Sequence, residues 1–377
     1  MTRRVLVVLE AGDAYPSGVV RGLIYKDSFA RHGYDVRFVS RLLPPLHRFL
    51  AAPPRALSVI LASGGGELLR RTERLFLSRR EAALVRIARD YDVVYMCKAS
   101  SFDLIRRLRN ETRARLVLDF TDALWLPNRR IEGFDALLGL VDAVTTDNEW
   151  TAAYVRPLQP NCTVIPDSPQ IEWFDRARAT RRRPDDRVVL GWVGTPSTTY
   201  NLFAVWEALE RVFSRRDNLH LRLVGANPRG LPPFERVTWS NRQGYSQGSM
   251  IDEVLGMHVG LFPLQDVEAC RVRGVLKASV YMAGGACVVA SPVGQNRDFI
   301  EHGVTGFLAS TVGEWEEVLL RVIDGADERT SVAENAMAMV RSQFTVERAF
   351  ELLRRVLDPD DAGTRIAPAP GRTDPTL

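Results

Sequence analysis

CRVRGVLKASVYMAGGACVVASPVGQNR, from Cys270 to Arg297, is the most informative segment of the chain. Its pattern predicts a basic loop, a short helix, a buried strand and a glycine-containing loop, in that order. This succession is typical of a βα unit whose loops hold a phosphorylated ligand. The segment contains Lys277, one of three lysines in a chain with 50 Lys and Arg residues in total. We therefore treat Lys277 as a candidate functional residue.

The composition of the 377 residues is that of an ordinary globular protein, with 46% hydrophobic and 25% charged residues. A single hydrophobic core rarely grows beyond about 300 residues, so we expect two domains. The net charge of +4 and the pI near 9.0 suit an anionic ligand or an anionic membrane surface. They do not by themselves indicate nucleic acid.

The four cysteines and five histidines show neither the spacing of a metal site nor that of a secreted disulfide framework. We therefore expect reduced thiols and no bound metal. The apolar run Val5–Leu9 imitates a signal peptide, but Glu10 and Asp13 end it too early. No stretch approaches the roughly 20 apolar residues of a membrane span. We expect a cytoplasmic protein.

Short runs rich in Val, Leu and Ile alternate with amphipathic segments, which is typical of parallel sheets covered by helices on both faces. The pattern lapses between residues 166 and 186, where Pro, Asp and a basic run indicate a linker. We expect strands at Val5–Leu9, Val36–Val39, Val93–Met96, Leu116–Phe120, Ala143–Thr146 and Thr163–Ile165, then at Val188–Val193, Leu221–Val224, Val259–Leu261, Cys287–Ala290 and Phe307–Ala309.

The fold class predicted from this pattern is α/β, with two Rossmann-like domains in tandem. Residues 1–165 form the first domain, 166–186 the linker and 187–345 the second domain. Residues 346–357 form a terminal amphipathic helix, because its apolar residues share one helical face. Residues 358–377 contain few large apolar residues, so we expect a disordered tail.

Residues 41–89 are strongly basic, with ten arginines against three glutamates and thus a local charge of +7. Interleaved leucines and phenylalanines form the apolar face that a membrane-surface helix needs, so one interpretation is peripheral contact with an anionic membrane. The alternative is a set of surface helices that pack on the first sheet and keep their arginines in solvent.

Two loops at the carboxyl ends of second-domain strands carry phosphate-binding residue types, and open α/β sheets bind ligands at such ends. In GWVGTPST (191–198), backbone N–H groups near Gly194, Thr195 and Ser197 suit a phosphate, although Thr or Ser also serves as a plain helix N-cap. Arg273 and Lys277 are four residues apart and would share a helix face if the helix starts near Gly274. They suit a diphosphate, or they are solvated surface cations.

Several strings together resemble the family 4 glycosyltransferases (glycosyl transferases group 1), which have the GT-B fold. No dinucleotide fingerprint, Walker loop or hydrolase triad competes with this resemblance. The strings in the second half are GWVGTPST (191–198), LRLVG (221–225), GLFPL (260–264), Lys277 with YMAGG (281–285), VVASPVGQN (288–296) and EHGVTGF (301–307). The first half adds the weaker strings DFTD (119–122), DAVTTDN (142–148) and VIP (164–166).

The resemblance implies transfer of a sugar from a nucleotide-sugar donor, with retention of configuration and without a metal or other cofactor. The second domain would bind the donor, the first the acceptor across a cleft, and the terminal helix would cross back to the first domain. Lys277, with Arg273 or Arg271, would stabilise the departing diphosphate. The implied donor-binding residues are Gly194, Thr195, Ser197, Trp239, Ser240, Arg271, Gly294 and Asn296. Trp239 would belong to a nucleobase loop just after a strand, or else pack against the core.

The sequence departs from the family at two positions. Many members carry two glutamates eight residues apart, and the corresponding residues here are Val272 and Val280. Glu268 is the nearest acidic residue and would serve from the same loop. The departure keeps two alternatives open besides a transferase, namely a nucleotide-sugar epimerase and an inactive GT-B protein that acts as a binding or partner subunit.

The acceptor side is expected at the carboxyl ends of first-domain strands. Asp122 would act there as a general base or orient the acceptor, unless it is an ordinary helix cap. Gly12 and Gly18 suit a loop near the acceptor, and Lys98 follows the Val93–Met96 strand. The acceptor class itself stays open between a glycan, a lipid-linked molecule and a small molecule.

Overall fold

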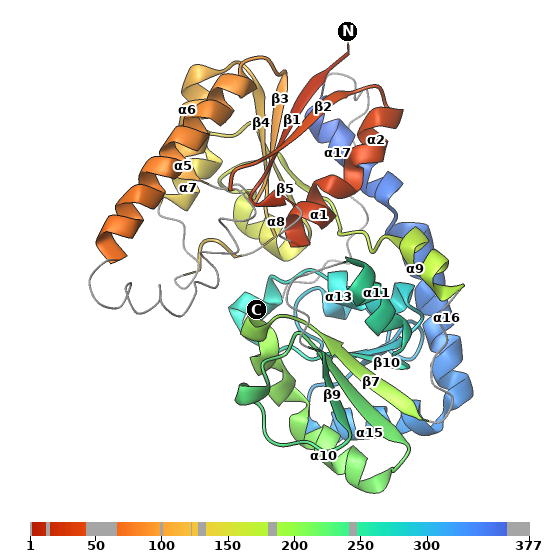
Figure 1. Ribbon diagram of the computed structural model, residues 1–377. Coiled ribbons are helices and arrows are strands. Elements are labelled where there is room, and N and C mark those ends of the chain that lie inside the picture. Colours follow the sequence, from red (N-terminus) through yellow and green to blue (C-terminus); the bar gives the residue numbers. More distant parts are fainter. Residues whose placement is uncertain are drawn as a thin grey trace.

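The computed structural model describes residues 2–12, 16–42, 66–98, 101–121, 123–126, 133–179, 187–240 and 247–359. It contains two parallel six-stranded sheets, each flanked by helices (Figure 1). This arrangement confirms the predicted α/β class with two Rossmann-like units in tandem. The strands lie close to the predicted segments because the apolar runs of the central strands are buried inside their sheets.

The first sheet has the order β2-β1-β3-β4-β5-β6. Helices α5 to α8 cover one of its faces, and the other face is covered by η2, α2 and the C-terminal helix α17. The strands are β1 (Arg4–Leu9), β2 (Asp35–Ser40), β3 (Val93–Cys97), β4 (Arg115–Asp119), β5 (Ala143–Thr146) and β6 (Cys162–Val164). The helices are α1 (Pro16–Arg21), η2 (Leu23–Tyr25), α2 (Lys26–Arg31), α5 (Gly66–Ala88), α6 (Phe102–Glu111), α7 (Phe134–Leu138) and α8 (Glu149–Val155).

The second sheet has the order β12-β11-β10-β7-β8-β9, in which β7 is the switch point between two directions of winding. Its strands are β7 (Val188–Val193), β8 (Leu219–Val224), β9 (Val237–Ser240), β10 (Val259–Phe262), β11 (Cys287–Ala290) and β12 (Phe307–Leu308). Its helices are η4 (Pro196–Ala204), α10 (Trp206–Arg215), η5 (Pro228–Gly230), α11 (Gln247–Leu255), α12 (Glu268–Arg271), α13 (Leu276–Ala283), α14 (Asn296–Phe299), α15 (Val312–Asp324) and α16 (Ala326–Gln343).

Strand β9 is missing from the expected strands, although a strand was expected to end just before Trp239. It has the mixed composition Val-Thr-Trp-Ser and lies at the edge of the sheet, where side chains stay partly accessible. An edge strand needs no continuous apolar run, so the criterion that identified the other strands does not detect it.

The predicted linker contains a helix, α9 (Ile171–Arg178). Its Ile171 and Phe174 are buried against the face of the second sheet that α11, α13 and α16 also cover. The chain therefore joins the second domain before the first strand of that domain begins. Residues 180–186 of the predicted linker lie outside the described residues.

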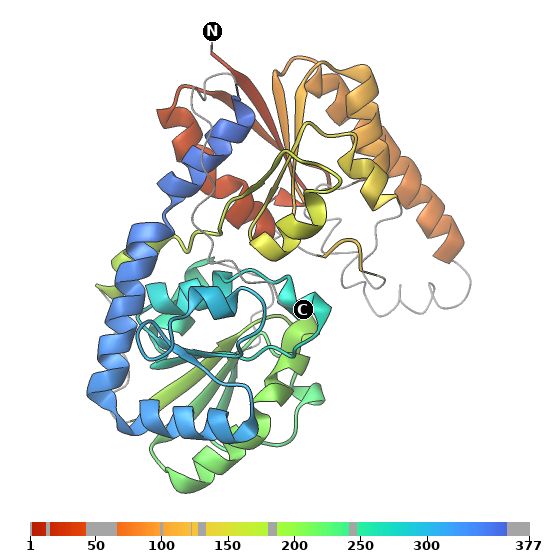
Figure 2. The same cartoon turned by 180° about the vertical axis from the view of Figure 1, so that it is seen from behind.

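Helix α17 (Val346–Leu357) returns to the first domain, as Figure 2 shows from behind. Phe350 is buried, and its ring lies 5.0 Å from the ring of Phe29 at 81°. Asp358 was expected to begin the disordered tail, but it is buried and forms an ion pair of 2.6 Å with Arg3 and a hydrogen bond with Tyr34. The rest of the expected tail, from residue 360, lies outside the described residues.

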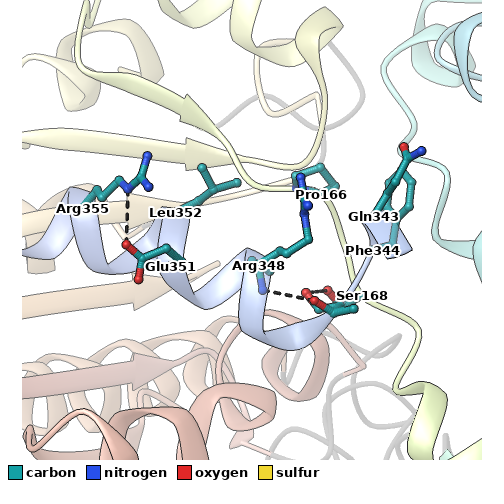
Figure 3. A pocket seen from close by; sticks show the side chains of 10 residues that line it. Pro166, Ser168, Gln343, Phe344, Arg348, Glu351, Leu352 and Arg355 are labelled. Carbon is teal, nitrogen blue, oxygen red and sulfur yellow. Dashed lines mark hydrogen bonds and ion pairs between the residues drawn. The ribbon is translucent and has the colours of Figure 1, made fainter. Parts of the chain in front are cut away.

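The two passages of the chain between the domains lie side by side. Ser168 Oγ donates a hydrogen bond of 3.0 Å to the carbonyl of Thr345, and the Thr345 hydroxyl caps α17. A cavity of about 360 Å³ opens beside this contact (Figure 3). Its lining residues are Pro166, Ser168, Gln343, Phe344, Thr345, Arg348, Ala349, Glu351, Leu352 and Arg355.

The basic segment 41–89 is described only in part, because residues 43–65 lie outside the described residues. The C-terminal part of α5 packs on the first sheet through Leu84 and Val85. Arg41 forms ion pairs with Glu10 and Glu81, so this arginine is not a solvated cation. None of the helices in the described ranges has the length and apolar character to cross a membrane.

We predict that Phe350→Ala lowers the free energy of unfolding by about 3–5 kcal/mol, since a buried aromatic ring is removed from a packed face. Urea denaturation measures the change. Arg355→Ala on the same helix is the control, because its exposed side chain should contribute within about 0.5 kcal/mol. A loss below about 1 kcal/mol for Phe350→Ala would contradict the role of α17 as a cover of the first sheet.

Candidate active site

Lys277 lies in the first turn of α13, above the ends of two central strands of the second sheet. Its Nζ atom is 4.8 Å from the ring centre of Trp192 on β7 and 5.9 Å from that of Phe262 on β10. Both rings are buried. An ammonium group above aromatic faces is stabilised by the ring quadrupole without being neutralised.

The electrostatic environment of Lys277 is unusual. Burial, followed by the nearby cation Arg273, lowers the pKa of its ammonium group from 10.5 to about 7. Within the described part of the chain, no carboxylate lies in ion-pair range of either cation, and the buried Nε of Arg273 has no hydrogen-bond partner. Two adjacent cations without counter-ions form a site for an anion.

Arg271 differs from Arg273, although both were assigned to the same loop. Its exposed guanidinium forms an ion pair of 2.6 Å with Asp266. The structure thus brings Arg273 and Lys277 together, but not on one helix face as expected, because α13 begins at Leu276 and Arg273 lies in the loop before it. Arg271 is directed toward a carboxylate instead.

The loop after β7 lies close to Lys277, since Lys277 contacts Trp192 on the same strand. Gly194 is required by packing, since a Cβ atom there would lie 2.0 Å from the Trp192 ring. Thr195 is the N-cap of η4, and its backbone N–H donates to Thr198 Oγ1 at 3.1 Å. Thr195 therefore acts as a helix N-cap, which was the alternative to phosphate binding. The exposed hydroxyl of Ser197 lies 3.0 Å from the hydroxyl of Thr195.

The loop after β11 packs against the segment that carries Arg271 and Arg273. Gly294 has φ +56°, and a Cβ atom there would lie 2.1 Å from the carbonyl oxygen of Arg271. Only glycine permits this conformation and this approach at low energy. Asn296 is buried and donates to the carbonyl of Ser291 at 3.0 Å, so its amide shapes the same loop.

The two residues expected in a nucleobase loop lie inside strand β9 instead of after it. Trp239 packs against the apolar cluster under β7 and β8, in agreement with the core-packing alternative. Ser240 Oγ donates to Glu253 at 2.6 Å. The expected loop itself, 241–246, lies outside the described residues.

Glu268 begins α12 and faces the first domain. Its Oε1 lies 3.5 Å from the indole Nε1 of Trp125, whose ring stacks on Tyr154 at 4.1 Å. Val272 and Val280, which were expected to correspond to two glutamates, are both buried. Val280 belongs to an apolar cluster of the second domain, and the carbonyl of Val272 accepts a hydrogen bond from Asn148 of the first domain. Glu268 is thus the carboxylate that this segment directs toward the other domain.

On the first domain, Gly12 and Gly18 come into close contact: a Cβ atom on Gly18 would lie 2.5 Å from the carbonyl oxygen of Gly12. Lys98 follows β3 with φ +55°, a conformation that is strained for a residue with a side chain. Its backbone N–H donates to the carbonyl of Asp119. Asp122 lies outside the described residues.

A buried charge cluster at the carboxyl ends of the first-domain strands was not predicted. Arg21 is 1% exposed and binds Asp119 at 2.6 Å and Asp167 at 3.0 Å. Asp147, at the end of β5, is also buried, and burial followed by the nearby charge of Asp167 raises its pKa. The aspartates at strand ends were visible in the sequence, but Arg21 precedes Asp119 by 98 residues and nothing local links them.

Comparisons with known proteins identify the relatives of this arrangement. Residues 187–324 match the family described as Glycosyl transferases group 1, which confirms the resemblance for the second domain. No curated protein sequence matches the chain.

Three solved structures show the fold of the whole chain. A glycosyltransferase from Rickettsia africae is 13% identical with a TM-score of 0.67, covering 96% of this chain and 100% of its own. HepE of Anabaena, in complex with UDP and glucose, is 15% identical with a TM-score of 0.65, covering 94% and 99%. Sucrose-phosphate synthase from Thermosynechococcus elongatus is 15% identical with a TM-score of 0.63, covering 96% and 100%. The expected GT-B fold is confirmed.

We predict that Lys277→Met stabilises the protein by an amount of the order of 2 kcal/mol at pH 6.5, because a desolvated and unpaired charge is removed. Since the folded pKa is about 7 and the ordinary value is 10.5, the unfolded chain binds more protons between these pH values. The destabilisation by Lys277 is therefore fully present below pH 7 and fades toward pH 10. Urea denaturation at pH 6.5 and pH 9.5 tests this, with the exposed Lys26→Met as control. A pH-independent difference would show that Lys277 is not desolvated.

We predict that Gly294→Ala lowers the free energy of unfolding by about 2–4 kcal/mol, through both a strained φ and a collision with the Arg271 carbonyl. Gly303→Ala is a matched control, because Gly303 also has a positive φ of +78° but no atom within 4 Å of an added Cβ. The control should lose only the strain contribution of about 1 kcal/mol. If both variants lost the same free energy of unfolding in urea, the close contact of Gly294 with the Arg271 carbonyl would not contribute to stability.

Proposed function

We propose that the protein is a glycosyltransferase that moves a sugar from a nucleotide-sugar donor to an acceptor hydroxyl. The observation that carries this proposal is the pair Lys277 and Arg273, two cations without a counter-ion in the described residues, above the carboxyl ends of the donor-side strands. The match of residues 187–324 to the group 1 glycosyltransferases supports it.

In the proposed reaction the bond between the anomeric carbon and the diphosphate oxygen breaks, and its electron pair remains on that oxygen. The acceptor oxygen forms the new bond to the anomeric carbon, and its proton passes to a base or to the departing phosphate. Negative charge grows on the diphosphate as the bond breaks. Lys277 and Arg273 stabilise this charge, and the aromatic floor under Lys277 strengthens the attraction by excluding water.

We further propose that the reaction retains the anomeric configuration and requires no metal or other cofactor. The cations of the protein supply the positive charge that a divalent metal supplies in other transferases. Retention is an inference from the family resemblance alone. Both features are tested by activity in a chelator and by the configuration of the product.

UDP is the nucleotide to test first, since the structures of HepE hold UDP and UDP-glucose. The acceptor is proposed to bind on the first domain near Lys98 and the contact of Gly12 with Gly18, and a glycan, a lipid-linked molecule and a small molecule are all candidates. A cytoplasmic location, and peripheral membrane contact through residues 41–89, stay predictions.

An inactive binding subunit is the second candidate. It is favoured by one observation, the buried valines at 272 and 280 in place of two glutamates. Such a protein would bind a nucleotide sugar at the same cations without turning it over.

We predict that UDP binding weakens about tenfold between pH 6.5 and pH 8.5, because Lys277 in the unliganded protein loses its proton near pH 7. Bound diphosphate raises this pKa, so binding above pH 7 takes up a proton. Isothermal titration calorimetry in two buffers of different ionisation enthalpy measures the affinity and the proton uptake. Lys277→Ala should abolish the proton uptake and weaken binding, whereas Lys26→Ala should change neither.

Turnover of a UDP-sugar distinguishes a transferase from a binding subunit and from an epimerase. We expect release of UDP from a UDP-sugar in the presence of an acceptor panel, with a loss of at least about 100-fold in Lys277→Ala. Wild-type turnover that survives in Lys277→Ala would overturn the assigned role. Tight UDP-sugar binding with no turnover across the panel would favour the binding subunit, and an isomerised donor without acceptor would favour an epimerase.

A further inference from the structure

The turn formed by Asp147 and Asn148 in the first domain contacts the donor-side loop of the second domain. This turn follows β5, and Asn148 is completely buried. Asn148 Nδ2 donates a hydrogen bond of 3.0 Å to the main-chain carbonyl of Val272, which is 124 residues away in the sequence. Val272 directly precedes Arg273, so this hydrogen bond holds the backbone next to a residue that is proposed to bind the diphosphate.

Asp147 forms the second half of the contact. Its Oδ1 accepts from Asn148 Nδ2 at 2.7 Å, which orients the amide toward the loop. A Cβ atom on Gly274 would lie 2.0 Å from Asp147 Oδ2, so the carboxyl group fills the space left by the missing side chain. Gly274 has no positive φ, so the requirement for glycine here is one of space alone.

The same loop is held from its other side by the second domain. Gly294 brings its backbone against the carbonyl of Arg271, and Cys270 is buried with its Sγ 3.4 Å from Asn201 Oδ1. The segment 270–274 therefore lies between a fixed loop of its own domain and the Asp147–Asn148 turn of the other. Arg273 projects from this segment, with its buried Nε unpartnered in the described part of the chain.

We infer that Asp147 and Asn148 are positioning residues, through which the first domain holds Arg273 in place for the donor diphosphate. The donor site is then complete only while the two domains are in contact. Charge stabilisation in a transition state requires donors that are already oriented, so a loop released from Asn148 supports less of it. The catalytic part of this inference rests on the proposed function.

Asn148→Ser is the primary test. Asn148 Oδ1 also accepts from the Thr151 N–H at 2.8 Å as the N-cap of α8, and serine is an equally good N-cap. The variant therefore removes the bond to Val272 and keeps the helix cap. We expect faster hydrogen exchange in residues 268–276 and unchanged exchange in 149–156, with kcat for UDP-glucose reduced about tenfold and KM changed less than threefold.

Asn161→Ser is the matched control, because Asn161 Nδ2 donates to the carbonyl of Asp142 at 3.1 Å within the first domain. It should leave both exchange and turnover unchanged. If Asn148→Ser and Asn161→Ser gave the same exchange in residues 268–276, the inference would be wrong. The exchange experiment needs no ligand, so its result is independent of whether UDP binds or a sugar is transferred.

Gly274→Ala tests the same contact through a residue of the second domain. The added methyl group meets the Asp147 carboxyl, so we expect the same faster exchange in residues 268–276. Asp147→Gly removes the carboxyl group that orients the Asn148 amide, so it should also raise exchange in residues 268–276. Wild-type exchange in residues 268–276 of Gly274→Ala would overturn the proposed juxtaposition.

Discussion

A parallel sheet has to be covered by helices on both faces, and the first domain completes this cover with a helix from the end of the chain. One face of its sheet is closed by α5 to α8, but the other is completed by α17 from the end of the chain. The chain thus passes between the domains twice, and Ser168 and Thr345 join the two passages. The turn after β5 also lies against the loop that carries Arg273.

The two domains treat buried charge in opposite ways. In the first domain Arg21 is neutralised by Asp119 and Asp167, so its burial is compatible with a stable fold. In the second domain Lys277 and Arg273 have no carboxylate in range among the described residues, and the pKa of Lys277 is depressed as a result of burial. Both side chains are half-buried, and unpaired charge that is partly removed from water destabilises a fold, which supports the proposal that the two cations bind a ligand.

Much of the site could be anticipated from short-range patterns. The basic loop before a short helix indicated where Arg273 and Lys277 lie, although their expected shared helix face was wrong, and the apolar periodicity of α17 located that helix at residues 346–357. Trp239 shows where such reasoning fails: a tryptophan in a polar edge strand looks like a loop residue until its packing is seen. Asp358 shows the opposite error: the polar sequence around it predicted disorder, but it pairs with Arg3 and Tyr34, which are distant in the sequence.

The amino-acid sequence alone determined the buried strands, the two-domain α/β class and the terminal helix, because these depend on periodicity over a few residues. Only the tertiary structure decided which distant groups meet. Arg21 reaches Asp119 across 98 residues, and Asn148 reaches Val272 across 124. Contacts of this kind are set by how helices cover sheets and how the two sheets face each other, and no local pattern encodes that geometry.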